Sequence, residues 1–207
     1  MRLVFLLCLF FSTTVFAQIP HEKALKMLMA GNRRFVSGDS KFPDRTSERR
    51  KETMDKQEPF AAILACSDSR VAPEIIFDLG LGDLFIVRVA GNVVGSLEQE
   101  SLDYSVFVLN SPLIVVLGHQ NCGAVKAVLD ENASSIPALA ELIQPAVDES
   151  AEMDGDKLEN ATQTNARLMA QKLREQTGFK RLIEQNKLRV KAGYYNFKTG
   201  KVEILPN

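Results

Sequence analysis

Three short runs of apolar residues, separated by segments with helical character, constrain the fold of this chain more than any other feature. They lie at 60–65 (FAAILA), 84–89 (LFIVRV) and 113–117 (LIVVL). Nearly unbroken apolar runs of this length are typical of strands covered on both faces, as in parallel sheets. The segment 73–79 begins with proline and is followed by Gly80, as helices often are. This alternation predicts an α/β fold with a central, mostly parallel β-sheet flanked by helices.

Further elements follow from local patterns. Apolar residues between 21 and 36 recur at helical spacing. Ser96 followed by Gln99 predicts a capping box at the start of another helix. The other predicted elements are helices at 47–56, 96–109, 121–129 and 179–187, a mostly helical stretch at 134–176 that breaks near Asp154 and Gly155, and strands at 188–197 and 202–205 around a turn at Thr199 and Gly200.

The first 17 residues differ in character from the rest of the chain. Arg2 precedes an apolar run over 3–11, and Val15 and Ala17 are aliphatic or small, as the −3 and −1 positions of a cleavage site require. The run is shorter than the roughly 20 residues that span a membrane, which favours a secretory signal peptide over 1–17 above an uncleaved anchor. We therefore expect a secreted protein, periplasmic if the source is a Gram-negative bacterium.

The remainder of the chain, 18–207, contains no long linker and is predicted to form a single catalytic domain. The formal net charge is −1, so no binding to nucleic acid, and none to membranes after cleavage, is expected. Cleavage would remove Cys8 and leave Cys66 and Cys122. In an oxidising compartment, a disulfide between these two is the simplest alternative.

Two segments rich in reactive side chains follow predicted strands, at 65–70 (ACSDSR) and 118–123 (GHQNCG). Ligands bind beyond the carboxyl ends of strands in open parallel sheets, so we expect Cys66, His119 and Cys122 to converge at one edge. Two thiolates and an imidazole suit tetrahedral zinc, and three protein ligands leave a fourth position for water. A core histidine or a disulfide would explain these residues singly, whereas the two segments together favour one Zn²⁺ per chain.

An acidic and a basic side chain accompany the first cysteine. Asp68 lies two residues after Cys66 and can either occupy the fourth position on the metal or accept a hydrogen bond from water there. Arg70 lies two residues further on and can hold Asp68 in a bidentate pair. Both positions of Asp68 are compatible with the sequence.

The order of these motifs closely resembles that of the β-class carbonic anhydrases. The matching segments are 66–71 (CSDSRV), 82–94 (GDLFIVRVAGNVV), 101–106 (SLDYSV), 114–125 (IVVLGHQNCGAV) and 194–205 (YYNFKTGKVEIL). The resemblance extends over roughly 24–205 and is weakest between 130 and 164. It implies that family's fold and the zinc-dependent, reversible hydration of carbon dioxide to bicarbonate and a proton.

The resemblance also implies roles for individual residues. Zinc would be bound by Cys66, His119 and Cys122. Asp68 and Arg70 would form a dyad that opens or closes the fourth coordination position, where hydroxide on zinc attacks carbon dioxide.

Four further positions match substrate-binding residues of the family. Gln57 falls where some members place a substrate-orienting glutamine, and Gly123 matches a glycine whose backbone N–H faces the substrate. Phe85 and Tyr104 match pocket-lining aromatics. A surface position for Gln57, and core positions for the two aromatics, stay open. Asn196 departs from the pattern, because aspartate is common there.

The resemblance implies a homodimer or homotetramer, since family members assemble with the active site at the subunit interface. Two other functions stay open. Close relatives use a related site to hydrolyse CS2 or COS, and a non-catalytic zinc-binding or redox protein could use the same three ligands. A non-catalytic zinc-binding or redox protein would not require the Asp68–Arg70 pair.

Overall fold

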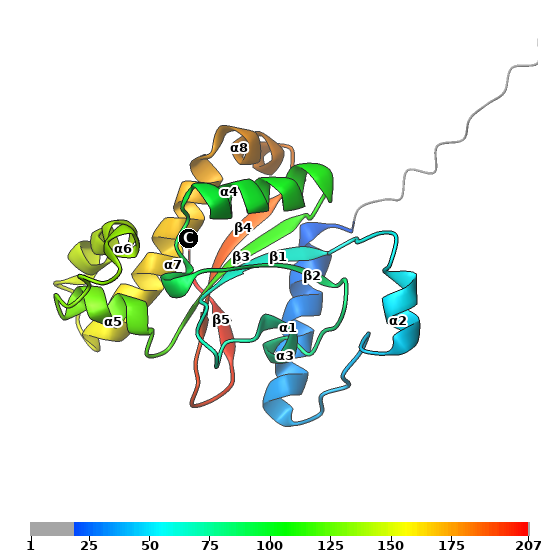
Figure 1. Ribbon diagram of the computed structural model, residues 1–207, viewed down its shortest axis with the longest axis horizontal. Coiled ribbons are helices and arrows are strands. Elements are labelled where there is room, and N and C mark those ends of the chain that lie inside the picture. The colour runs from blue at the N-terminus through cyan, green and yellow to red at the C-terminus, as the bar shows by residue number, and fades with distance from the viewer. Residues whose placement is uncertain (1–18, 207) are drawn as a thin grey trace, which may run out of the picture.

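A computed structural model describes residues 19–206, so the predicted signal peptide over 1–17 lies outside the described residues. Five strands form one sheet in the order β2-β1-β3-β4-β5 (Figure 1). Strands β1 to β4 are parallel, and β5 is antiparallel to β4. The predicted α/β fold with a mostly parallel sheet is confirmed. The strands are β1 Ala61–Ala65, β2 Leu84–Arg88, β3 Leu113–His119, β4 Arg189–Tyr195 and β5 Val202–Ile204.

Helices cover both faces of the sheet, which explains why β1 and β3 are buried along their whole lengths. Ala61, Ile63 and Ala65 face the side packed by α1 and α3, whereas Ala62 and Leu64 face the side packed by the later helices. The helices are α1 His21–Ser37, α2 Ser47–Glu52, α3 Pro73–Ile76, α4 Ser96–Asp103, α5 Gly123–Leu129, α6 Pro137–Ser150, α7 Lys157–Glu175 and α8 Thr177–Glu184, with a 3-10 turn at Ala90–Asn92 and a π-helix at Tyr104–Val108.

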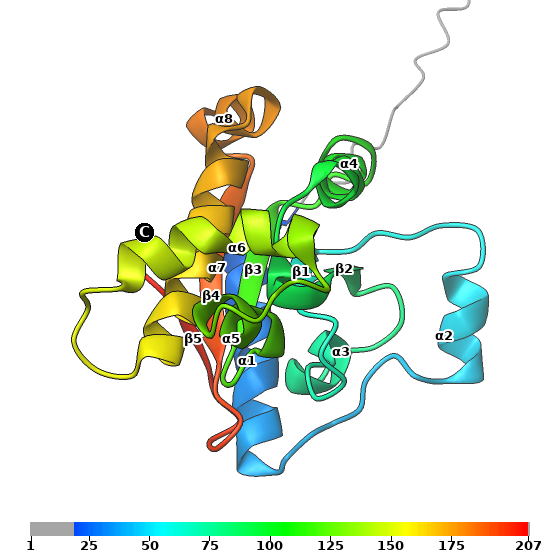
Figure 2. The ribbon, with the colours of Figure 1, turned by 60° about the vertical axis from the view of Figure 1, so that its left-hand side comes forward.

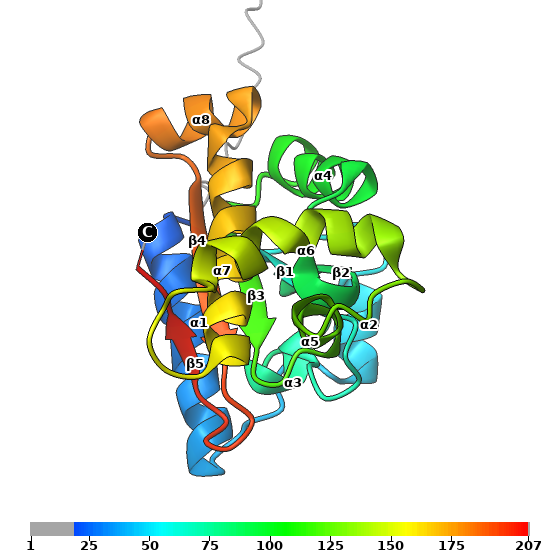
Figure 3. The ribbon, with the colours of Figure 1, turned by 90° about the vertical axis from the view of Figure 1, so that its left-hand side faces the viewer.

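The arrangement of the helices gives the molecule two distinct ends. Helices α4 and α8 lie at one end in all three views, and α5, α6 and α7 are grouped together (Figures 1, 2 and 3). The turn between β4 and β5 lies at the opposite end (Figure 1). Helix α2 lies apart from the sheet, between extended segments (Figure 2). Among residues 19–206, no helix has both the length and the apolar character of a membrane span.

Local chemistry explains where several helices begin and end. Gly38 adopts a left-handed φ of 78° after α1, and its N–H donates to Phe35 O at 3.3 Å, which closes the helix. Helix α7 begins where the Asp156 carboxylate accepts a hydrogen bond from Glu159 N–H at 2.8 Å. Gly155, at φ 103°, separates α6 from α7, as the predicted break requires.

Several predicted boundaries differ from the structure by a few residues, and two of these differences have a clear physical cause. Helix α4 is capped one residue earlier than expected, because Gly95 is the N-cap and its N–H donates to Glu98 Oε2 at 3.0 Å. The predicted pairing of Ser96 with Gln99 is therefore replaced by Gly95 with Glu98. Strand β3 continues two residues beyond 117, because His119 pairs with Tyr195 on β4. Tertiary pairing thus extends the strand past its apolar run.

Candidate metal centre

The chain leaves the neighbouring strands β1 and β3 toward opposite faces of the sheet. After β1 it passes to α3, whose Ile76 packs on the α1 side, and after β3 it passes to α5, whose Val125 packs on the other side. Such a divergence leaves a crevice beyond the carboxyl ends of the strands. Cys66 directly follows β1, and His119 is the last residue of β3, so both lie at this crevice.

The side chains of Cys66, His119 and Cys122 meet there. Their candidate ligand atoms all lie within 4.8 Å of one another. A tetrahedral zinc ion with bonds of about 2.0–2.3 Å holds its ligand atoms roughly 3.5 Å apart, so small side-chain movements suffice to bind one. The three residues are 4%, 0% and 0% exposed. Both cysteines are free thiols, so the disulfide alternative is absent from the described structure.

The orientation of His119 leaves one ring nitrogen available. Its Nδ1–H donates to the Gln120 carbonyl oxygen at 2.9 Å, and Gln120 N–H donates in turn to Tyr195 O at 2.9 Å. The other nitrogen, Nε2, is buried and has no hydrogen-bond partner. An unpartnered buried polar atom is unfavourable. A histidine that donates one N–H to a carbonyl and directs the other nitrogen into a thiol pair has the arrangement of a metal ligand.

The two thiols also need a cation. A hydrogen bond from Cys122 lowers the pKa of Cys66 to about 4, and the same contact, together with burial, raises the pKa of Cys122. The pair therefore shares one proton, because two buried thiolates in contact repel each other. Both thiols ionise only when a positive ion neutralises them, so the donor set fits a divalent metal that prefers sulfur and nitrogen.

A turn after β2 supports the Cys66 sulfur. Gly91, at a left-handed φ of 73°, donates its N–H to Cys66 Sγ at 3.3 Å. The carbonyl of Gly91 accepts a hydrogen bond of 2.7 Å from the buried side chain of Asn165 on α7. The sequence contains no signal for this chain of contacts, because it depends on a left-handed turn and on the packing of α7.

Asp68 and Arg70 form the predicted bidentate pair. Arg70 Nε and Nη2 donate to Asp68 Oδ1 and Oδ2 at 2.9 and 2.8 Å. These hydrogen bonds lower the pKa of Asp68 to about 2. Within residues 19–206, the metal-binding group contains three residues, and Asp68 is not one of them. Of the two positions open to Asp68, the structure thus shows the one beside Arg70.

Arg88, at the end of β2, holds the loop that carries the dyad. Its Nε donates to Cys66 O at 3.2 Å, and its Nη2 donates to Asp68 O at 2.7 Å. The backbone on both sides of Ser67 is therefore tied to the neighbouring strand.

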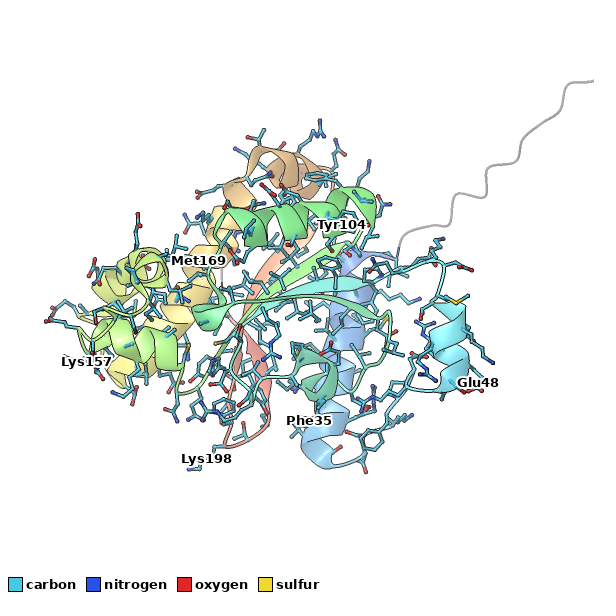
Figure 4. The ribbon with its side chains drawn as sticks, in the orientation of Figure 1. Phe35, Glu48, Tyr104, Lys157, Met169 and Lys198 are labelled. Atoms are coloured by element: carbon cyan, nitrogen blue, oxygen red, sulfur yellow. The ribbon has the colours of Figure 1, made fainter. Side chains whose placement is uncertain are left out.

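The four residues matched to substrate-binding positions do not gather in one place. Gly123 directly follows Cys122 and has open space around it. Gln57 and Tyr104 instead line a surface cavity of about 920 Å³ beyond the amino ends of β1 and β3, and no member of the metal-binding group lines it. The Phe85 ring lies 6.2 Å from that of Tyr104. Figure 4 shows Tyr104 near α4, at the end of the molecule opposite Lys198.

An aromatic residue missed by the sequence reasoning also belongs to the site. The Phe197 ring lies 5.3 Å from the His119 ring, and the Arg70 guanidinium carbon lies 4.3 Å from the centroid of the Phe197 ring. Because β4 is the parallel neighbour of β3, the rule of carboxyl strand ends would have placed Phe197 at this edge.

Comparison with known proteins assigns the chain to a family. Residues 61–202 match the family model described as carbonic anhydrase, which is more than half of the chain. The chain belongs to the β-class carbonic anhydrase family. The resemblance seen in the order of the motifs is thereby confirmed, and both candidate metal-binding segments lie inside the matched region.

Individual carbonic anhydrases show how far the similarity extends. Carbonic anhydrase 2 of Mycobacterium tuberculosis is 54% identical over 106 residues, 51% of this chain and 51% of that protein, so the match spans about half its length. The carbonic anhydrase of Pseudomonas aeruginosa is 33% identical over 167 residues, 72% of this chain and 74% of that protein. A solved structure from a study of two tetrameric β-carbonic anhydrases of Sordaria macrospora has a TM-score of 0.73 at 18% identity, covering 89% of this chain and 98% of that one, which shows a shared fold.

Proposed function

We propose that the protein is a zinc enzyme that reversibly hydrates carbon dioxide to bicarbonate and a proton. Cys66, His119 and Cys122 hold the metal, and Asp68 with Arg70 acts beside it. The observation that carries this proposal is the buried, unpartnered Nε2 of His119, which faces two thiols in a chain of this family. No core or disulfide role explains that nitrogen.

Zinc, when bound, supplies a Lewis acid that lowers the pKa of a water in its fourth position, chemistry for which carbonic anhydrases are the reference case. The residues of the chain bind and orient the substrate. Asp68, with a pKa of about 2, stays ionised near neutral pH and acts as a hydrogen-bond acceptor. It can accept the hydroxyl proton of bicarbonate in a hydrogen bond and so orient that ion. Arg70 fixes the carboxylate for this task, and the backbone N–H of Gly123 faces the substrate.

Metal analysis combined with a stopped-flow assay tests the proposal. We expect one zinc per chain and carbon dioxide hydration over roughly pH 6 to 9, the range in which such proton transfers operate. A protein with full zinc and no hydration would disprove the activity. The same preparation assayed with CS2 and COS then separates a related hydrolase from a zinc-binding protein without catalysis.

We further propose a homodimer or homotetramer whose copies complete one another's sites. Support comes from Gln57 and Tyr104, which lie far from the metal-binding group of their own chain. Exposed apolar side chains that line the same cavity add to it, since such patches mark interaction surfaces: Met54, Tyr104 and Val108. Analytical ultracentrifugation should find no monomer, and Val108→Lys should dissociate the assembly. A wild-type monomer with full activity would contradict the proposal.

Export through an N-terminal signal peptide remains our proposal for the location. It rests on the apolar run over 3–11 and the residues around Ala17. N-terminal sequencing of the protein recovered from the source cells should begin near Gln18. Recovery of an intact Met1 from the cytoplasm would refute it.

A further inference from the structure

Phe197 contacts two parts of the site at once. It lies just beyond the carboxyl end of β4, and its ring is 5.3 Å from His119, at an interplanar angle of 51°. On the Arg70 side, the guanidinium carbon lies 4.3 Å from the ring centroid. Phe197 is thus the residue through which a metal-ligand strand meets the Asp68–Arg70 pair.

We propose that Phe197 is a positioning residue that holds the Arg70 guanidinium flat against its ring and thereby keeps Asp68 beside the metal instead of on it. This inference deepens the proposed function and rests on it. On this proposal, an aromatic side chain just beyond β4 determines which of the two positions left open by the sequence Asp68 adopts.

The geometry of Arg70 shows why a second support is needed. The edge of the guanidinium is taken by the Asp68 carboxylate, but the Arg70 side chain is 54% exposed and the Asp68 side chain 16% exposed. An ion pair this open to solvent restrains two side chains only weakly. A planar guanidinium also stacks on an aromatic face, which attracts the cation and restricts its orientation. Phe197 supplies that face.

The ring itself is held firmly enough to serve as a platform. Tyr195 contacts it edge-on, with the centroids 5.4 Å apart and the planes at 88°. The turn that follows is fixed by Asn196, whose Oδ1 accepts a hydrogen bond of 3.0 Å from Thr199 N–H. Lys198 N–H donates to Gln120 Oε1 at 3.4 Å, which ties the turn to the residue after His119. A support held by its own neighbours can position a side chain reproducibly.

Matched variants separate the aromatic face from simple bulk. Phe197→Leu keeps an apolar side chain of similar size but removes the ring, whereas Phe197→Tyr keeps the ring. We expect Phe197→Leu to lower kcat about tenfold with zinc content and thermal midpoint nearly unchanged, and Phe197→Tyr to stay within about twofold of the wild type. Equal losses in the two variants would show that the ring face is not what matters.

A double-mutant cycle tests whether the effect passes through Arg70. In an Arg70→Gln background there is no guanidinium to hold, so Phe197→Leu should have little further effect on kcat/KM. A tenfold loss that persists in this background would overturn the proposal. Cobalt substitution provides the control for His119. The absorption spectrum of the cobalt-substituted protein should be the same for the wild type and for Phe197→Leu. A changed spectrum would mean that the ring acts on the metal ligand instead.

A readout without turnover separates this inference from the proposed activity. The ring current of Phe197 should shift the NMR signal of the Arg70 Nε–H upfield in the metal-free protein. The shift should vanish in Phe197→Leu and persist in Phe197→Tyr. If the wild type hydrates no carbon dioxide but shows this shift, the activity is wrong and the positioning stands. If hydration is normal but the shift is absent, the positioning is wrong.

Discussion

Arg70 donates three hydrogen bonds to Asp68, from its backbone N–H and Nε to Oδ1, each at 2.9 Å, and from Nη2 to Oδ2 at 2.8 Å. Both carboxylate oxygens are therefore occupied by the arginine. Asp68 keeps its negative charge and its remaining lone pairs beside the three candidate metal ligands. Asp68 is therefore a hydrogen-bond acceptor beside the metal-binding group. Removing Asp68 should consequently have different effects from removing a metal ligand.

Asp68→Ala should retain zinc and lose most of its activity. The substitution leaves Cys66, His119 and Cys122 in place, whereas loss of a positioned proton acceptor lowers the rate by roughly 10²–10⁴-fold. Zinc content by atomic emission and carbon dioxide hydration by stopped flow, measured on one preparation, check both parts.

Cys66→Ser is the matched comparison, because it removes a ligand from the same loop. It should lose zinc as well as activity. If Asp68→Ala released as much zinc as Cys66→Ser, Asp68 would be a structural ligand and the position seen beside Arg70 would not be the one that operates.

Removal of the metal should expose both thiols and lower stability. A bound ion stabilises the folded state by an amount that grows with its concentration above Kd, so a chelator should reduce the thermal midpoint by several degrees. Thiol titration of the folded protein should find Cys66 and Cys122 protected before chelation and reactive after it. A protein without reactive thiols until a reductant is added would instead contain the disulfide that was the simplest alternative.

The strands were predictable because burial on both faces leaves a run of apolar residues that sequence displays directly. Residues 61–65 are such a case. The convergence of Cys66 with His119 was predictable too, since it needs only parallel strands and the rule that sites lie at their carboxyl ends. The dyad followed from a spacing of two residues within one loop.

The parts that escaped prediction depend on contacts between distant segments. Gly91 reaches Cys66 through a left-handed turn and is itself held by Asn165 on α7. Phe197 reaches Arg70 only because β4 pairs with β3 in a register that places Tyr195 opposite His119. Neither register nor packing of this kind is written in a local pattern. Gly91 and Asn165 therefore had no signal, and for Phe197 the rule of carboxyl strand ends could give only its edge of the sheet.

Gly91→Ala should destabilise the protein and loosen the metal site. Any side chain is unfavourable at φ 73°, by about 1–2 kcal/mol, and the added methyl carbon would lie 2.8 Å from Ile143 Cδ1. The turn would shift, and the hydrogen bond to Cys66 would weaken with it. Urea unfolding measures the stability, and zinc transfer to a chromophoric chelator measures the release rate, which should rise.

Gly38→Ala is the control, because Gly38 has a similar φ of 78° but nothing within 4 Å of the added carbon. It should cost about 1 kcal/mol from backbone conformation alone and leave zinc release unchanged. If both variants released zinc at the wild-type rate, the contact of Gly91 with Cys66 would have no role in holding the metal.

Stability at acid pH should depend on Asp78, a buried carboxylate that is not part of the metal-binding group. Burial raises its pKa, but the backbone N–H groups of Lys41 and Phe42 and the Arg34 guanidinium, at 2.6 Å, donate to it and hold the pKa below its ordinary value. A depressed pKa means that this stabilisation is complete above the unfolded value of about 3.9 and is lost as the pH falls through the folded value.

Asp78→Asn removes the charge and therefore the pH-dependent part of this contribution. At pH 7 the variant should be less stable by roughly 3–5 kcal/mol, because the buried donors lose a charged partner. As the pH falls below about 4, wild-type stability should fall toward that of the variant, so the difference in urea midpoint narrows. Glu149→Gln, at an exposed position, should follow the wild type throughout. A gap between wild type and Asp78→Asn that stayed constant down to about pH 3 would show that Asp78 does not titrate with unfolding in this range.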